Sequence, residues 1–264
     1  MQHKKTIGLI GGGFVGGALG RYFDRKGHPV RVYDKYKSLD SIQTVLEQDI
    51  IFIAVPTPFN GKIDLSAIDD AMSNAARAPE GKIVVIKSTV IPGTTEKYQA
   101  SYPHLKILIN PEFLTESTAE QDFAFPDRQI VGYTTRSHHV AGEVMDVLPT
   151  APHTKFVPAT AAEAIKYFGN NWFAVKVAFA NQMYDLCEKL GLDYDIVRDA
   201  VAADKRIGHS HLDVWHGGYR GYGGKCLPKD IRAMIVFADE LGLDLKLLKV
   251  TEEINHGLTG GVDR

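Results

Sequence analysis

The stretch "IGLIGGGFVGGALG", residues 7–20, decides the fold of this chain. A short apolar run leads into the spacing G-x-G-x-x-G, formed by Gly11, Gly13 and Gly16, and a helical pattern follows. In a strand–turn–helix unit these glycines serve a tight turn, the close approach of a pyrophosphate, and the packing of helix on strand. The stretch therefore predicts a dinucleotide site, the alternative being that the glycines serve packing alone.

The residues around this turn indicate which dinucleotide binds. We expect the diphosphate at the helix N-terminus, where unpaired N–H groups favour anions, so Phe14 and Val15 are predicted cofactor contacts as well. Asp34 ends the second predicted strand, where a carboxylate binds ribose hydroxyls and repels a 2′-phosphate. This favours NAD over NADP, although Lys35 and Lys37 act against the preference.

Apolar runs rich in β-branched residues continue to alternate with helical patterns as far as residue 158. Such runs suit strands that are buried on both faces of a parallel sheet. We therefore expect residues 1–158 to form a doubly wound, Rossmann-type α/β domain that binds NAD. From Ala159 the pattern becomes helical, with one long helix that stops near Gly191, so residues 159–264 are expected to form an all-helical domain.

The composition points away from several classes of protein. The chain of 264 residues is 44% hydrophobic and 23% charged, and its net charge of −2 gives no sign of a nucleic-acid or membrane partner. No apolar run is long enough to span a bilayer and the N-terminus does not resemble a signal peptide, so we expect a cytoplasmic protein. His209, His211 and His216 share a loop without the partners of a zinc motif, and no metal is expected.

The second informative stretch is "GYGGKCLPKD", residues 221–230. Pro228 suits the first position of a helix, which places Cys226 just outside that helix's N-terminus. The helix dipole and the flanking Lys225 and Lys229 lower the pKa of such a thiol, and the thiolate is the nucleophilic form. The pattern favours a reactive cysteine over an incidental one.

Polar residues also follow three of the predicted strands. Thr57, Ser88 and Thr89 would lie at the carboxyl edge of the sheet, where open α/β sheets bind ligands, although such residues are more often caps or turns. Glu112 and Glu116 lie four residues apart and suit either general bases or helix-start carboxylates.

The long helix predicted from Ala159 has two contrasting faces. Glu163, Lys166 and Asn170 lie on one face, and their spacing alone favours a solvated surface. Asp230 suits either the orientation of a water molecule or the start of a later helix. An apolar stripe follows the other face of the long helix at 3.6-residue spacing: Ile165, Phe168, Trp172, Val175 and Phe179.

Taken together, these motifs resemble the UDP-glucose/GDP-mannose 6-dehydrogenase family. In chain order they are "GGGFVG", "AVPTP", "KSTVIPGTT", "NPEFLTESTAEQDFAFPDRQIVG", "AEAIKYFGNN", "DKRIG" and "GYGGKCLPKD", which span nearly the whole sequence. The resemblance implies oxidation of the C6 alcohol of a nucleotide sugar such as UDP-glucose to a carboxylate, with two NAD⁺ and no metal. It also implies a homodimer built around the long helix.

The resemblance also assigns chemical roles. Cys226 would be the nucleophile that forms a thiohemiacetal and then a thioester. Lys166 would stabilise the oxyanion, with Asn170 beside it. Asp230 and Thr89 would move protons through a bound water molecule.

Further assignments follow from the same resemblance. Glu112 would be the base for thioester hydrolysis, and Glu116 and Thr57 would lie near the nicotinamide. Arg206, in "DKRIG", would reach the sugar across the dimer interface. The substrate contacts would be Phe113, Leu114, Lys166, Asn170, Arg206 and Gly223.

Two departures from the family pattern leave alternatives open. The family continues into a third domain that binds the nucleotide base, whereas this sequence stops at "EEINHGLTGGVDR", so we expect the third domain to be absent. A protein that binds NAD and nucleotide sugars with little turnover is therefore one alternative, and a two-electron hydroxyacid dehydrogenase is another. The loop before Cys226 is longer than usual, and its aromatic residues Trp215, Tyr219 and Tyr222 are expected to stack on a base.

Overall fold

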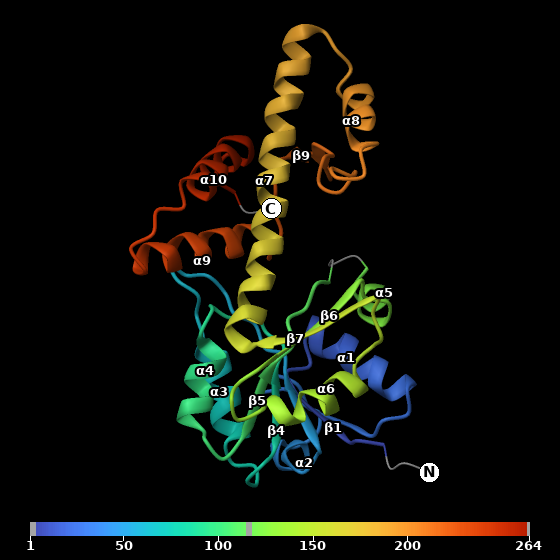
Figure 1. The fold of residues 1–264 in the computed structure, drawn as a ribbon, viewed down its shortest axis with the longest axis vertical. Helices are drawn as coiled ribbons and strands as arrows, with labels where there is room; N and C mark the ends of the chain where they lie inside the picture. The colour runs from blue at the N-terminus through green and yellow to red at the C-terminus, as the bar shows by residue number, and fades with distance from the viewer. Residues whose placement is uncertain (1–3, 115–117, 263–264) are drawn as a thin grey trace. The chain divides into compact units, whose positions relative to one another are not determined.

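A computed structural model describes residues 4–114 and 118–262 of the chain. The chain divides into two compact units, residues 1–166 and 167–264, here called the sheet unit and the helical unit (Figure 1). The long helix α7 (Ala159–Leu190) begins in the sheet unit and continues into the helical unit.

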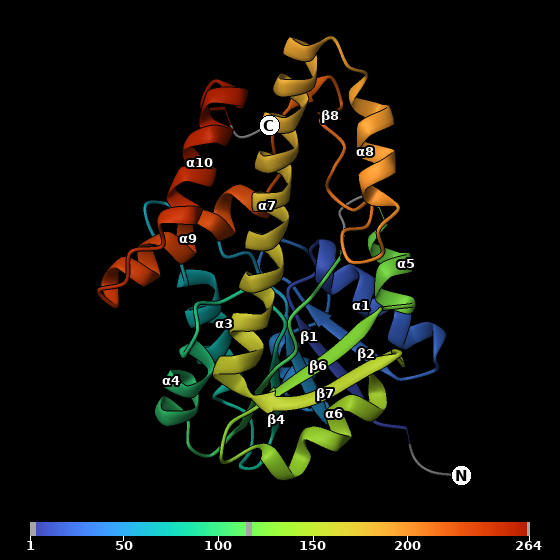
Figure 2. The same ribbon diagram turned by 45° about the horizontal axis from the view of Figure 1, so that its top comes forward.

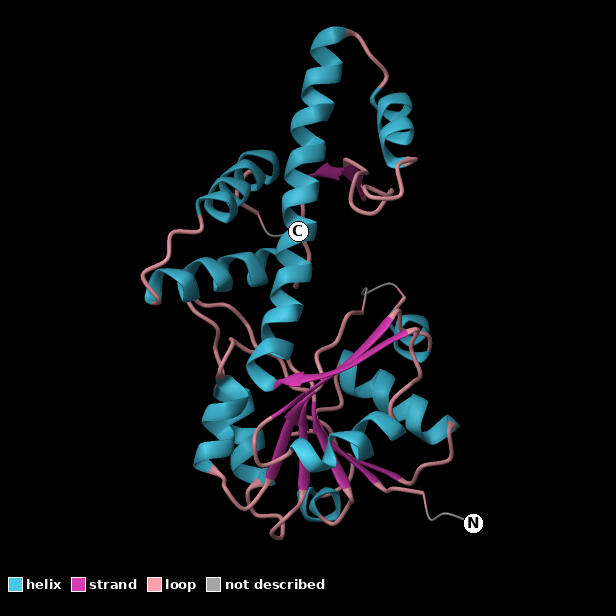
Figure 3. Cartoon of the chain, viewed as in Figure 1, coloured by secondary structure: helices cyan, strands magenta, loops and turns pink. Residues whose placement is uncertain are grey.

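The sheet unit contains a seven-stranded sheet in the order β2-β1-β3-β4-β5-β6-β7, drawn in magenta in Figure 3. Its strands are β1 (Ile7–Ile10), β2 (Val30–Tyr33), β3 (Ile50–Ile53), β4 (Ile83–Ile86), β5 (Lys106–Ile109), β6 (Arg128–Tyr133) and β7 (His153–Pro158). The first five strands are parallel, with Ile7 opposite Val30 on one side and Ile50 on the other. β6 pairs antiparallel to β5 and parallel to β7, so these last two strands run in the opposite direction (Figure 2).

The burial of the strands follows their place in the sheet. β1, β3 and β4 are buried along their whole length, as their apolar sequences predict for central strands. The expectation of burial on both faces is wrong for β7, which is exposed at nearly every position. β7 is the edge strand beside β6, and its sequence "HTKFVP" includes the polar and charged residues that an edge tolerates.

Helices cover both faces of the sheet, which confirms the predicted doubly wound architecture. One face packs against α2 (Ile42–Leu46), α3 (Ser66–Ala75), α4 (Thr94–Ser101) and the first turns of α7. The other face packs against α1 (Phe14–Arg25), α5 (Ala119–Ala124), the 3₁₀ turn η1 (His138–Val140) and α6 (Ala141–Val147).

The helical unit consists of the remainder of α7 and three further helices. These are α8 (Tyr194–Ala202), α9 (Leu227–Glu240) and α10 (Lys246–Thr259). A two-stranded hairpin, β8 (Trp215–His216) with β9 (Tyr219–Arg220), lies in the loop between α8 and α9. Gly191, with a φ of 66°, follows α7 as the predicted stop.

Large apolar side chains remain outside the interior of the helical unit. Phe168 is 77% exposed and Trp172 is 59% exposed, so most of the predicted apolar stripe of α7 faces away from the interior. We use the name α7 apolar stripe for the large apolar side chains of α7 that are exposed, which extend the predicted stripe towards the end of the helix: Phe168, Trp172, Phe179, Leu186 and Leu190. Over the ranges that the structure describes, none of the helices has both the length and the apolar composition needed to cross a bilayer.

Candidate active site

The glycine turn shows a separate physical role for each of its three glycines. Gly11 has a φ of 102°, and a Cβ there would lie 2.3 Å from the carbonyl oxygen of Ala54. A Cβ on Gly16 would lie 1.9 Å from the carbonyl oxygen of Gly11, whereas a Cβ on Gly13 would meet nothing within 4 Å. Gly13 is also the N-cap of α1 and offers no side-chain cap to the first helical amides. The turn is thus closed on its inner side and open at Gly13, which fits a dinucleotide phosphate.

Asp34 is fixed beside this turn by backbone amides. Its carboxylate accepts hydrogen bonds from Gly12 N at 2.8 Å and from Tyr36 N at 2.9 Å. Partial burial alone would raise the pKa of Asp34, but these two amides and the nearby Lys37 outweigh burial and lower it. Asp34 therefore presents a negative charge next to the first turn of α1.

Two hydroxyl groups join the carboxyl ends of β3 and β4. The Ser88 hydroxyl donates to the Val55 carbonyl at 2.7 Å and accepts from the Val55 amide at 3.0 Å. The Thr57 hydroxyl donates to the Thr89 carbonyl at 2.8 Å. Ser88 thus has a structural role, and Thr57 and Thr89 lie together at the edge where the cofactor contacts are predicted.

The sheet unit also contains a buried ion pair between two predicted catalytic residues. Lys166 Nζ lies 3.0 Å from Glu112 Oε1, and the Leu114 amide donates to the other carboxylate oxygen at 2.7 Å. Lys166 Nζ also lies 5.9 Å from the ring centroid of Phe113. Burial alone would raise the pKa of Glu112, but Lys166, the Leu114 amide and Lys87 together lower it. Glu112 is consequently held as a carboxylate.

Lys87 is a member of this cluster that the sequence did not reveal. Its ammonium donates to Asn110 Oδ1 at 2.8 Å and to the Pro111 carbonyl at 3.3 Å. Burial lowers the pKa of Lys87 to about 7, with Glu112 acting against this shift and Lys166 adding to it. The only local signal was a lysine placed directly after the buried strand "IVVI".

The polar face of α7 is buried, so its interpretation as a solvated surface is wrong. Glu163 is 1% exposed and accepts hydrogen bonds from Gly93 N at 2.5 Å and from Thr95 N and Oγ1 at 2.7 Å each. These donors belong to the start of α4, so Glu163 anchors the first turns of α7 to α4 within the sheet unit. Burial raises the pKa of Glu163, although the hydrogen bonds from Thr95 and Gly93 oppose it. Lys166 and Asn170, on the same face, are buried as well.

The helical unit brings three of the predicted catalytic residues together. Cys226 is the N-cap of α9 and its side chain is exposed. The Asp230 amide donates to the Cys226 carbonyl at 2.9 Å, and Asn170 Nδ2 donates to Asp230 Oδ2 at 2.5 Å. Lys229 Nζ lies 2.5 Å from the other Asp230 oxygen. The Asp230 carboxylate is therefore buried and held on two sides, one turn into the helix that starts at the thiol.

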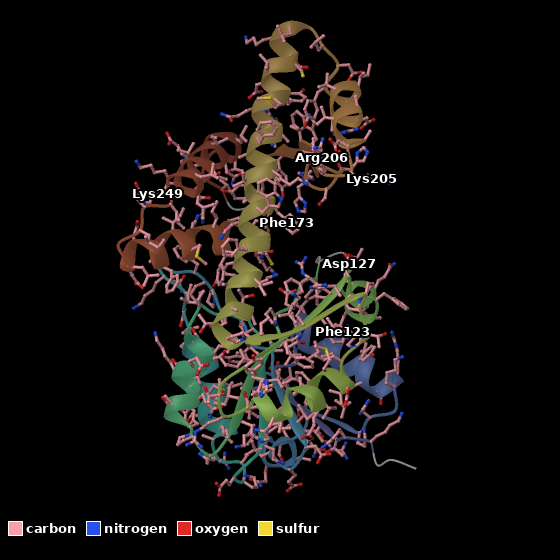
Figure 4. All side chains as sticks on the ribbon, viewed as in Figure 1. Phe123, Asp127, Phe173, Lys205, Arg206 and Lys249 are labelled. Atoms are coloured by element: carbon pink, nitrogen blue, oxygen red, sulfur yellow. The ribbon has the colours of Figure 1, made fainter. Side chains whose placement is uncertain are left out.

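The other predicted substrate contacts are less enclosed. Arg206 lies in the loop after α8, where Figure 4 labels it, and its exposed guanidinium pairs with Asp204 at 2.5 Å. Gly223 is half-buried and precedes Gly224, whose φ is 72°. Glu116 lies outside the described residues.

The loop between α8 and α9 corrects one expectation. The Tyr222 ring is 3% exposed and its hydroxyl donates to Glu252 Oε2 at 2.7 Å, so Tyr222 is not free to stack on a base. Trp215 remains exposed. His211 stacks on Phe173 with ring centroids 4.0 Å apart. Within the described residues, no three histidine, cysteine or carboxylate side chains gather as metal ligands.

Sequence comparisons match both parts of the chain. Residues 35–148 match the profile of the "UDP-glucose/GDP-mannose dehydrogenase family, NAD binding domain", and residues 160–257 match that family's "central domain". The first match confirms the prediction of an NAD-binding domain. It begins just after Asp34, so the glycine turn lies outside the matched residues.

Curated relatives extend the similarity over more of the sequence. UDP-glucose 6-dehydrogenase AglM of Haloferax volcanii is 34% identical over 85% of this chain, and this chain spans 56% of that protein. UDP-glucose 6-dehydrogenase of Rhizobium meliloti is 32% identical over 94% of this chain and 67% of the relative. The chain thus spans about half to two thirds of the length of these relatives.

Solved structures share the fold. A UDP-glucose dehydrogenase from Pyrobaculum islandicum superposes with a TM-score of 0.87 at 31% identity, over 97% of this chain and 68% of that one. A 3-hydroxyisobutyrate dehydrogenase from Mycobacterium tuberculosis has a TM-score of 0.76 at 17% identity, over 99% and 96% of the two chains. The second likeness concerns the fold alone.

Proposed function

Because this chain belongs to the UDP-glucose/GDP-mannose dehydrogenase family, we propose that it oxidises the C6 alcohol of a nucleotide sugar to a carboxylate. UDP-glucose is the first substrate to test, since it appears in the names of the similar proteins. The observation that carries the proposal is the exposed thiol of Cys226 at the N-cap of α9, with the buried Asp230 one turn further on.

The chemistry divides into two oxidations and one hydrolysis. Bound NAD⁺ would accept one hydride in each oxidation. After the first oxidation, the Cys226 thiolate adds to the C6 aldehyde and forms a C–S bond, while the Lys166 ammonium stabilises the oxyanion. Loss of the C6 hydride from this thiohemiacetal gives a thioester. Water then breaks the C–S bond, so that one alcohol, one water and two NAD⁺ yield one carboxylate, two NADH and three protons.

The polar clusters support the roles assigned to them. A base must be deprotonated, and the pair with Lys166 keeps Glu112 ionised, which suits Glu112 to take the proton of the attacking water. Asn170 fixes the Asp230 carboxylate at 2.5 Å, which suits Asp230 to orient a water molecule, and Thr89 is likewise assigned to proton transfer through water. Thr57, at the same sheet edge as Thr89, is assigned to the nicotinamide side of the cofactor.

We assign the remaining contacts of the cofactor and the substrate by the same argument. The diphosphate binds at the open side of the glycine turn, next to Phe14 and Val15, and the ribose binds Asp34. The substrate contacts are Phe113, Leu114, Lys166, Asn170, Gly223 and, from the other subunit, Arg206.

We also propose that the protein is a homodimer in which a second copy covers the α7 apolar stripe. Its five members are large apolar side chains, each at least half exposed in the single chain. An exposed stripe of this kind is characteristic of an association surface. The exposed guanidinium of Arg206 is in keeping with a contact made in the other subunit.

The decisive experiment is the NADH yield per molecule of UDP-glucose at complete consumption. Wild-type protein should give two NADH per sugar, Cys226→Ser should give at most one because the second oxidation needs the thiohemiacetal, and Cys187→Ala should match wild type because Cys187 is a buried core residue. A yield of one NADH in wild-type protein that is unchanged in Cys226→Ser would favour a two-electron dehydrogenase. NAD⁺ binding without NADH formation on UDP-glucose, GDP-mannose or N-acetylated UDP-sugars would favour a binding protein. Either of these outcomes contradicts the proposal.

A further inference from the structure

We propose that Asn255 of α10 is a positioning residue for Cys226, because it fixes the loop of residues 221–225 that leads to the thiol. This inference rests on the proposed role of Cys226 as the nucleophile. Asn255 lies in the stretch "EEINHGLTGGVDR", in which the sequence predicts no site residue, and it is 2% exposed.

The Asn255 side chain holds a single residue of that loop by two hydrogen bonds. Its Oδ1 accepts from the Tyr222 amide at 2.7 Å, and its Nδ2 donates to the Tyr222 carbonyl at 3.0 Å. A carboxamide offers an acceptor and a donor side by side without a charge. The two bonds together fix both the position and the direction of the backbone at Tyr222.

Helix α10 also contacts the chain on the C-terminal side of Cys226. The Tyr222 hydroxyl donates to Glu252, one turn before Asn255, and the other Glu252 oxygen pairs with Arg232 Nε. Arg232 belongs to α9, the helix that starts directly after Cys226. α10 therefore fastens the chain four residues before the thiol and six residues after it.

The glycines of the loop explain why an outside anchor is needed. Gly221 and Gly224 have φ values of 88° and 72°, and glycine-rich segments have little intrinsic preference for one conformation. A Cβ on Gly221 would lie 2.5 Å from Asn255 Oδ1, so the loop packs directly on the amide that holds it. The effect of a helix N-terminus on a nearby anion falls off within the first turn. The reactivity of Cys226 is therefore sensitive to small displacements of this loop.

The inference can be tested without substrate or cofactor, by alkylating Cys226 with iodoacetamide. In a Cys187→Ala background Cys226 is the single thiol of the chain. The rate of alkylation is measured from about pH 5 to about pH 9, which gives the apparent pKa of the thiol. Asn255→Ala and Asn255→Asp are compared with Glu253→Gln, a control at an exposed position on the same helix.

We expect Asn255→Ala to change the alkylation rate at pH 7 roughly threefold or more and to shift the midpoint of the pH profile. Asn255→Asp keeps the acceptor and loses the donor, so its shift should lie in the same direction. Glu253→Gln should superimpose on the parent. Should Asn255→Ala fail to fold, as judged by circular dichroism, the comparison of Asn255→Asp with Glu253→Gln tests whether Asn255 positions Cys226. If the folded Asn255 variants and Glu253→Gln share one profile, the inference is overturned.

Turnover separates this inference from the proposed function. With UDP-glucose, the Asn255 variants should lower kcat while the KM for NAD⁺ stays unchanged, because none of the residues assigned to the cofactor belongs to α10. A rise in the KM for NAD⁺ with constant kcat would overturn the positioning role. If Cys226→Ser kept full turnover, the proposed function would fail, and the alkylation profiles would still decide whether Asn255 positions the thiol.

Discussion

The sheet unit and the helical unit differ in the size of their apolar cores and in the large apolar side chains that they leave exposed. In the sheet unit, the isoleucines and valines of β1, β3 and β4 are buried on both faces, and large apolar side chains fill the layers on each side. In the helical unit the α7 apolar stripe lies outside, while Asn170, Asp230 and Asn255 lie inside. The sheet unit thus has two large apolar layers, whereas the helical unit has two small apolar clusters and leaves exposed the α7 apolar stripe that the proposed homodimer would cover.

The largest effect is expected from a substitution that disturbs the close packing of the sheet unit. Gly16→Ala places a methyl group 1.9 Å from the Gly11 carbonyl oxygen, so the backbone has to shift. We expect the free energy of unfolding to fall by about 3 kcal/mol, measured by urea denaturation.

Gly13→Ala is the matched control, because its methyl group meets nothing within 4 Å. Its free energy of unfolding should stay within about 0.5 kcal/mol of wild type. NAD⁺ affinity, measured by titration calorimetry, should still fall about tenfold because the methyl group occupies the approach to the turn. Equal destabilisation by the two alanines would show that the turn does not divide into a packed side and an open side.

The second prediction tests whether the apolar surface of the helical unit needs a partner. The double variant Phe168→Asp/Trp172→Asp places charges in the α7 apolar stripe, and we expect the dimer Kd to rise about 100-fold, equivalent to about 2.7 kcal/mol. Sedimentation equilibrium measures this change. Phe125→Asp, at an exposed position in the sheet unit, should leave the mass unchanged. An unchanged dimer Kd in the double variant would show that the exposed apolar surface of the helical unit does not need a partner.

The third prediction concerns the charge buried in the sheet unit. The pKa of Lys87 is about 7 in the folded chain against an ordinary value of 10.5, so between these pH values the unfolded chain holds a proton that the folded chain has lost. Wild-type stability should therefore rise with pH across this window, and Lys87→Met should remove that rise.

At about pH 6 Lys87 is charged and buried, and its hydrogen bonds to Asn110 and Pro111 offset only part of the cost of burying that charge. We expect Lys87→Met to be more stable than wild type by about 2 kcal/mol at this pH and less stable than wild type by about pH 10, because only wild type gains stability across this window. Urea denaturation at several pH values measures the slope. Lys62→Met, at an exposed lysine, should keep the wild-type slope, and a parallel slope in Lys87→Met would contradict the prediction.

Local features of the fold were readable from the sequence because their causes are local. The glycine turn, the stop at Gly191 and the helix start after Cys226 all depend on a few neighbouring residues. The reversed direction of β6 and β7 was not readable, because an apolar run indicates a buried strand without indicating which way it runs.

The polar cluster of the sheet unit shows a second limit. The spacing of Glu163 and Lys166 suggested a solvated helix face, because their partners Thr95 and Glu112 lie more than fifty residues away in the chain. Lys87 carried no functional signal, since only the folded chain reveals how completely it is buried beside Glu112. Resemblance to a family assigned roles to Glu112 and Lys166, but it assigned none to Lys87.

The arrangement around Asp34 has a consequence for cofactor affinity. Because the amides of Gly12 and Tyr36 already hold both carboxylate oxygens, the rotational freedom of this side chain is lost when the chain folds. When a diol hydrogen bonds to Asp34, this side chain therefore loses no further conformational entropy. The Asp34 side chain is in this respect ordered before any dinucleotide binds.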